Sequence, residues 1–73
     1  MNYDLDTPEG MANAVAWQEQ LVETLEEGGR WGVPRSGAVY TVYPSKKVAV
    51  RIVHEEEIDR VFNVMGWQVR EEL

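Results

Sequence analysis

The sequence predicts an α+β fold in which two helices pack on one face of a small, mostly antiparallel sheet. Apolar residues recur at helical spacing in two acidic segments near the two ends of the chain. Between these segments lie two runs rich in β-branched and aromatic residues, which are typical of strands. The expected order is α-β-β-α-β, with an additional short strand near Trp31 as an alternative. Because a chain of 73 residues is short, residues 1–73 should form one domain.

The first helix is expected over residues 8–27, after a loose arm formed by residues 1–6. Its start has two candidate caps, Asp6 in a capping box with Glu9, or Thr7 followed by proline at the first helical position. Gly28–Gly29 should end it. Gln18 interrupts the apolar stripe and is expected to be hydrogen-bonded at the edge of the core. The stripe itself consists of Met11, Ala14, Val15, Leu21, Val22 and Leu25.

Residues 38–43 and 48–53 read as two strands of a hairpin joined by a turn. In the second of these strands, Val48, Val50 and Ile52 are expected to face the core, and Ala49, Arg51 and Val53 to face outward. A second helix is expected over residues 55–65, because apolar residues recur there at i, i+3, i+4 and i+7. These residues are Ile58, Val61, Phe62 and Met65. Residues 67–70 should form the last strand.

Charge is divided into three blocks along the chain. Residues 1–29 carry seven acids and no base, residues 30–54 carry five bases and no acid, and residues 55–73 carry six acids and two bases. The block charges of −7, +5 and −4 give the net charge of −6. One interpretation is that the blocks neutralise one another across the fold. The other is a molecule with an acidic and a basic face, suited to a charged partner.

No pattern of residues indicates an enzyme, a metal site or a bound cofactor. The chain has no cysteine, and His54 is its only histidine, so we expect this side chain to cap a helix or pair with a glutamate. Neither of the two glycine-rich phosphate-binding motifs, GxxxxGK(S/T) and GxGxxG, occurs in the sequence. The longest uncharged run is too short to span a bilayer, and the acidic start is unlike a signal peptide. These observations predict a non-enzymatic intracellular protein without a membrane partner.

A protein-binding module is the function that remains. Trp, Tyr and Arg carry much of the binding energy at interfaces, and the segment 30–35 holds a tryptophan and two arginines. Glutamates at i, i+4 and i+8 of the first helix form a predicted acidic ridge. Core positions for the tryptophans and a solvated ridge are the alternatives. The candidate partner-binding residues are Trp17, Glu19, Glu23, Glu27, Arg30, Trp31, Arg35, Glu55 and Glu56.

Nucleic-acid binding is a second hypothesis. It would use the bases of the middle block, with Tyr40 and Tyr43 available for stacking. An isoelectric point near 4.6 argues against it, since nucleic-acid-binding domains are usually basic. A third hypothesis is a host-directed inhibitor of a defence nuclease. The basic residues that would contact nucleic acid under the second hypothesis are Arg30, Arg35, Lys46, Lys47 and Arg51.

Three segments carry a resemblance, namely residues 1–6, 29–37 and 65–69. With the chain length, they resemble the small early transcription regulators of tailed bacteriophages, such as those of lytic Xanthomonas phages. The resemblance implies a monomer in the host bacterial cytoplasm that binds the RNA polymerase core near the β′ amino-terminal region and the β flap. It further implies competition with sigma, inhibition of initiation and antitermination during host takeover. It assigns no individual functional residues.

Overall fold

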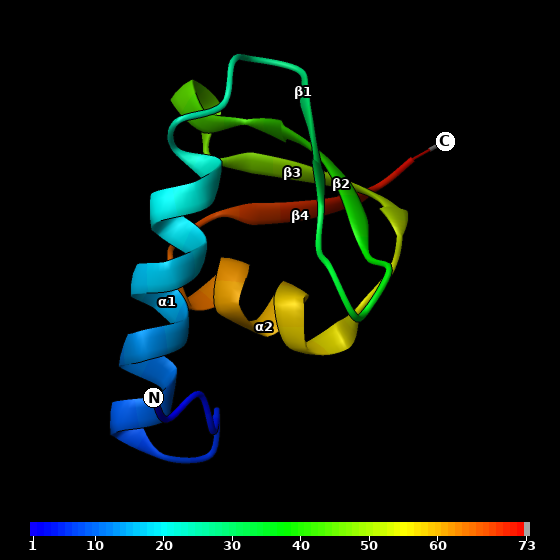
Figure 1. Cartoon of the computed structure of the whole chain (residues 1–73). Helices are drawn as coiled ribbons and strands as arrows, with labels where there is room; N and C mark the ends of the chain where they lie inside the picture. The colour runs from blue at the N-terminus through cyan, green and yellow to red at the C-terminus, as the bar shows by residue number, and fades with distance from the viewer. Residues whose placement is uncertain (73) are drawn as a thin grey trace.

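Four strands form a single sheet that is covered on one face by two helices (Figure 1). The computed structural model describes residues 1–72. The strands lie in chain order across the sheet; β1, β2 and β3 are antiparallel, and β4 is parallel to β3. The elements are α1 (Pro8–Val22), β1 (Gly29–Gly32), β2 (Val39–Tyr43), the short 3₁₀ helix η1 (Pro44–Lys46), β3 (Val48–Val53), α2 (Glu56–Val64) and β4 (Gln68–Glu71). The predicted α+β class is confirmed, and the optional strand at Trp31 is β1.

Helix α1 begins with Thr7 as its N-cap, which is one of the two predicted caps. The hydroxyl of Thr7 accepts a hydrogen bond from the Gly10 N–H at 3.0 Å, and Pro8 occupies the first helical position, where no N–H is needed. The preceding residues lie against this first turn, since the Asn2 carbonyl accepts from the Asn13 side chain at 2.8 Å. A methyl group at Gly10 would lie 1.9 Å from the Asp4 carbonyl oxygen, so glycine is required for this contact.

The predicted end of the first helix is wrong by five residues, because α1 stops at Val22 rather than at residue 27. The chain then turns back on itself: the Leu25 N–H donates to the Val22 carbonyl at 3.2 Å, and the Gly29 N–H donates to the Glu26 carbonyl at 2.8 Å. These turns let Leu25 pack on the core and let β1 begin immediately after Gly28, whose φ is +78°. The double glycine therefore serves the entry to a strand.

Aromatic rings fill the space between the helices and the sheet. Phe62 of α2 lies 5.3 Å from Tyr40 and 5.2 Å from Trp67, measured between ring centroids. Trp31 packs edge-on against Phe62 at 5.8 Å. The buried residues of α1 are Gly10, Ala14, Gln18 and Val22, of which Val22 belongs to this cluster, whereas Leu21, expected in the stripe, is 40% exposed. The buried residues of α1 therefore recur at every fourth position. This spacing was hard to recognise in the sequence because one of the four positions holds a glutamine.

The predicted facing of the second hairpin strand is wrong for Ala49, Val50 and Arg51, whereas Val48 is buried and Val53 is exposed, as expected. In the register of β2 and β3, Tyr40 pairs with Arg51 and Val42 with Ala49, so Ala49 and Arg51 share the helix-covered face. Ala49 is fully buried there, and Arg51 reaches an aspartate of α2. Alternation alone could not choose between the faces, since Val50 on the other face is also apolar.

Candidate partner-binding surfaces

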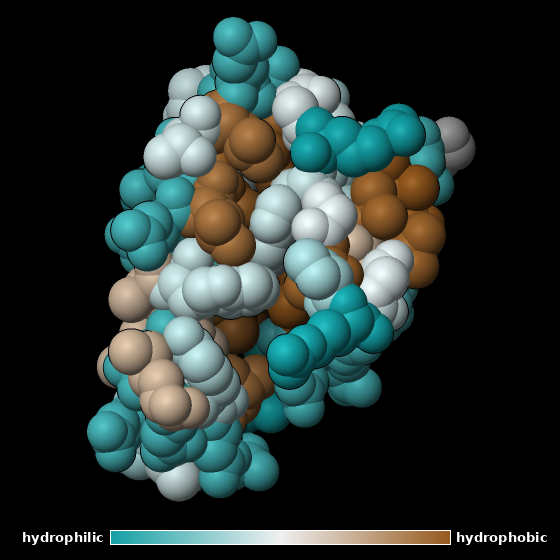
Figure 2. Space-filling view, in the orientation of Figure 1, coloured by the Kyte–Doolittle hydropathy of each residue, from teal (hydrophilic) through white to brown (hydrophobic). Residues whose placement is uncertain are grey.

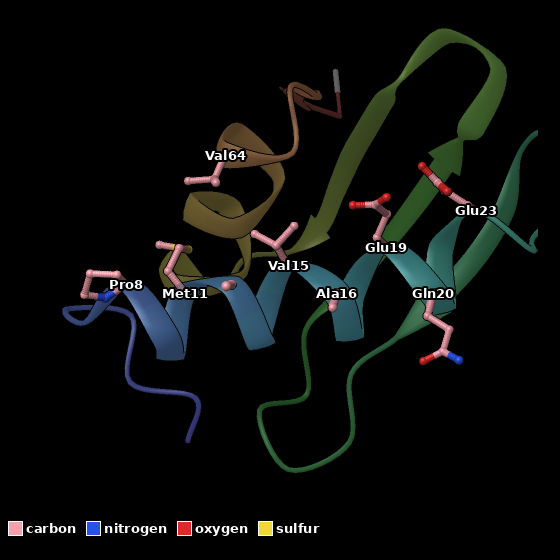
Figure 3. A pocket seen from close by; sticks show the side chains of 9 residues that line it. Pro8, Met11, Val15, Ala16, Glu19, Gln20, Glu23 and Val64 are labelled. Atoms are coloured by element: carbon pink, nitrogen blue, oxygen red, sulfur yellow. The ribbon is translucent and has the colours of Figure 1, made fainter. Parts of the chain in front are cut away.

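A shallow groove of about 690 Å³ runs between α1 and the end of α2 (Figure 3). Its apolar part is formed by Met11 and Val15 of α1 and by Val64 of α2, which point toward one another in Figure 3. Val64 is 57% exposed. Glu19 and Glu23 continue the line of Met11 and Val15 at four-residue spacing. We call this surface the α1–α2 groove; its other lining residues are Pro8, Ala12, Ala16 and Gln20.

Two carboxylates at one end give the α1–α2 groove its charge. Within residues 1–72, no ion pair engages Glu19 or Glu23. Glu27, the third member of the predicted ridge, lies beyond the helix, and its carboxylate accepts a hydrogen bond from the Ser45 N–H at 2.6 Å. This bond from the Ser45 backbone lowers the pKa of Glu27 below its ordinary value of 4.5. The ridge of three glutamates is therefore corrected to a row of two.

Segment 30–35, which was predicted to contribute binding energy through its tryptophan and two arginines, is divided between the core and two separate surfaces. Trp31 is only 7% exposed, so it is a core residue, which was the alternative interpretation of the tryptophans. Trp17 is half-buried at the rim of the core, with its ring 5.9 Å from that of Trp31. Arg30 and Arg35 are exposed, but Arg30 alternates with the inward-facing Trp31 on β1, whereas Arg35 lies in the following turn with a φ of +75°. No single surface unites these four side chains.

The two glutamates predicted at the start of the second helix have different surroundings. Glu55 is the N-cap of α2, and its carboxylate accepts from the Glu57 N–H at 3.3 Å. Glu56, in the first turn, is exposed and lies where the helix dipole favours an anion. Glu55 therefore has a structural task, and only Glu56 presents its charge outward.

Asp59 organises a polar cluster that the sequence analysis missed. Its carboxylate accepts from the Tyr40 hydroxyl at 2.6 Å, pairs with Arg51 at 3.2 Å and pairs with the His54 Nε2 at 2.8 Å. Burial, reinforced by this carboxylate, raises the pKa of Tyr40. His54 thus pairs with an aspartate rather than with the expected glutamate. No group of three or more metal-ligating side chains occurs within the described part of the chain.

The residues of the nucleic-acid hypothesis do not form one interface. The Arg51 guanidinium is held between Asp59 and Glu71, the latter at 2.6 Å, and Tyr40 is fully buried. Lys46 and Tyr43 remain near the surface, with the lysine nitrogen 5.8 Å from the ring centroid. The geometry thus removes one base and one stacking residue from this hypothesis.

A second cleft, of about 530 Å³, lies between the N-terminal segment, α1, α2 and the turn after β1. Its walls include Trp17, Val33 and Ile58, with Arg35 and Glu57 also lining it. Gln18 contributes to the lining, and its side-chain oxygen is buried without a hydrogen-bond partner in the structure.

Comparisons with family models, curated proteins and solved structures found no match to the chain. Among residues 1–72, no helix is both long and apolar enough to cross a membrane. Among the described surfaces, the α1–α2 groove combines an open apolar floor with two carboxylates that make no ion pair within residues 1–72.

Proposed function

We propose that the chain is a non-enzymatic bacteriophage protein that binds the RNA polymerase core of its bacterial host and inhibits transcription initiation. The α1–α2 groove is the proposed contact. The observation that carries this proposal is the row Met11, Val15, Glu19 and Glu23, which places an apolar floor and two carboxylates on one exposed helix face. A partner segment with apolar residues and nearby lysines or arginines complements this row.

Polymerase surfaces that handle nucleic acid or sigma are rich in basic residues, which supports the choice of partner. Glu19 and Glu23 would steer such a surface to the groove and speed association, and apolar contacts at Met11, Val15 and Val64 would slow dissociation. The resemblance to phage transcription regulators supplies the β′ amino-terminal region and the β flap as the place of contact. Occupying that place would compete with sigma in the host cytoplasm, and antitermination is a further activity that the resemblance implies.

A pull-down from bacterial lysate tests the proposal. The tagged protein should capture polymerase subunits equally with and without nuclease treatment, and it should reduce sigma-dependent transcription by purified polymerase. Replacing Glu19 and Glu23 with lysine should lower polymerase affinity at least tenfold, because two attractive pairs become repulsive. The matched control Glu26→Lys/Glu72→Lys changes net charge equally at exposed sites outside the groove and should bind normally.

Three outcomes would refute this reading. Capture of nuclease-sensitive material alone would favour the nucleic-acid hypothesis. Capture of a nuclease in place of polymerase would favour an anti-defence inhibitor. Unchanged polymerase affinity of the Glu19→Lys/Glu23→Lys variant would exclude the groove as the contact.

A further inference from the structure

The face of the sheet opposite the helices has a composition that differs from the rest of the molecule. Trp31, Tyr40, Val42, Ala49 and Val69 belong to the core on the helix-covered side. Strand alternation therefore directs their neighbours to the other side, which we call the outer face. Its residues are Arg30, Gly32, Val39, Thr41, Tyr43, Val48, Val50, Val53, Gln68 and Arg70.

Charge on the outer face is exclusively positive among these ten strand residues, although the chain as a whole has a net charge of −6. The two charged residues lie in one row across the sheet: Arg30 pairs with Thr41, Thr41 with Val50, and Val50 with Arg70. Neither arginine makes an ion pair within residues 1–72. Three strand spacings separate the two edge strands, so the backbones beneath the arginines are about 14 Å apart.

Thr41 and Val50 lie between the two arginines, and further apolar side chains extend to one end of the sheet. The register of β2 and β3 shifts after Tyr40, so that Val39 pairs with Val53 and both Ile52 and Val53 lie near it. Val53 is 47% exposed, and Gly32 on the neighbouring strand adds no side chain. Figure 2 shows a hydrophobic area at the right, where the ends of β2 and β3 lie in Figure 1, away from α1.

We propose that the outer face binds an amphipathic helix with acidic flanks from a partner protein. An α-helix with its side chains is about 10–12 Å across, which fits between arginines on strands about 14 Å apart. Its apolar stripe would cover Thr41, Val50 and Val53, and glutamates or aspartates on either flank would pair with Arg30 and Arg70. The added helix would complete a three-layer arrangement around the sheet.

This inference goes beyond the proposed function, because the α1–α2 groove and the outer face select ligands of opposite charge. A single-stranded nucleic acid suits the outer face less well. Such binding depends on aromatic stacking, and the outer face offers only Tyr43, against whose ring Lys46 already lies. The protein would thus hold a basic segment on its helices and an acidic helix on its sheet.

The probe for the test is a synthetic helical peptide of about 18 residues with leucines at i, i+3, i+4 and i+7 and glutamates on both flanks. It should shift the methyl NMR signals of Val39, Val50 and Val53 and leave those of Val15 and Val64 unmoved. Arg30→Glu/Arg70→Glu should weaken binding about tenfold, since each exposed ion pair contributes up to about fivefold and reversal adds repulsion. Thermal unfolding checks that this variant is folded.

The matched control is Arg35→Glu/Arg60→Glu, which changes net charge equally at exposed arginines outside the outer face and should alter affinity by about twofold or less. A peptide with lysine flanks should not shift the outer-face methyls. The proposal is overturned if the acidic peptide leaves those methyls unmoved, if both double variants weaken binding equally, or if a single-stranded oligonucleotide displaces the peptide. Because the readout is local to the sheet, loss of polymerase binding would not affect it.

Discussion

Replacing Gln18 with methionine should stabilise the protein, although it removes a hydrogen bond. Gln18 is fully buried; its amide nitrogen donates to the Ile58 carbonyl at 3.3 Å, and its oxygen has no partner in the structure. Losing one long hydrogen bond costs roughly 0.5–1.5 kcal/mol, whereas removing a buried unpaired acceptor gains about 1–3 kcal/mol. Methionine has a similar length and flexibility, so packing changes little. The expected net gain is about 1 kcal/mol.

Urea unfolding followed by tryptophan fluorescence measures this gain. With an m value near 1 kcal/mol/M for a domain of this size, the midpoint should rise by about 1 M. Thermal unfolding should shift upward by about 4–8 °C. Gln20→Met is the matched control, because Gln20 is exposed on the same helix and its replacement should change stability by less than about 0.5 kcal/mol. A lower midpoint for Gln18→Met would refute the reasoning.

Three further predictions concern stability and local order. Asp59→Asn should destabilise the fold by about 2 kcal/mol in urea, because Tyr40 and Arg51 lose a charged partner; an unchanged midpoint would contradict this. The lowered pKa of Glu27 stabilises the fold above pH 4.5, and this contribution is lost as pH falls through the folded-state pKa; Glu27→Gln should flatten the acid side of the pH–stability curve, and an equal slope would argue against the Ser45 contact. Gly10→Ala should displace the N-terminal segment, so that chymotrypsin cleaves after Tyr3 or Leu5 faster than in the parent; equal rates would show that the segment does not need this contact.

Much of the fold could be predicted from local patterns. The start of α1, the hairpin and α2 each follow from signals within a few residues, namely a cap beside proline, β-branched runs and an apolar i, i+3, i+4 spacing. The end of α1 could not, because residues 23–27 have good helix propensity and leave the helix only to let Leu25 and β1 meet the core. Tertiary contacts decide that boundary.

The candidate surfaces were harder to predict than the elements. Glu19 and Glu23 follow from helical spacing, but Glu27 was predicted to join them because the predicted helix extends five residues too far. The outer-face arginines were not predicted as a pair, since Arg30 and Arg70 are brought into one row by the combined register of all three strand pairs. Such a juxtaposition depends on register across four strands, which no local spacing encodes.

The strand order has a consequence for how the chain folds. Neighbours in the sheet are also neighbours along the chain, so β1, β2 and β3 can pair by closing short loops as soon as they meet. The parallel pair of β3 and β4 must wait until the intervening α2 has formed and docked. We therefore expect β4 to join last and to exchange its amide hydrogens first, which makes one side of the sheet the earliest to open under native conditions.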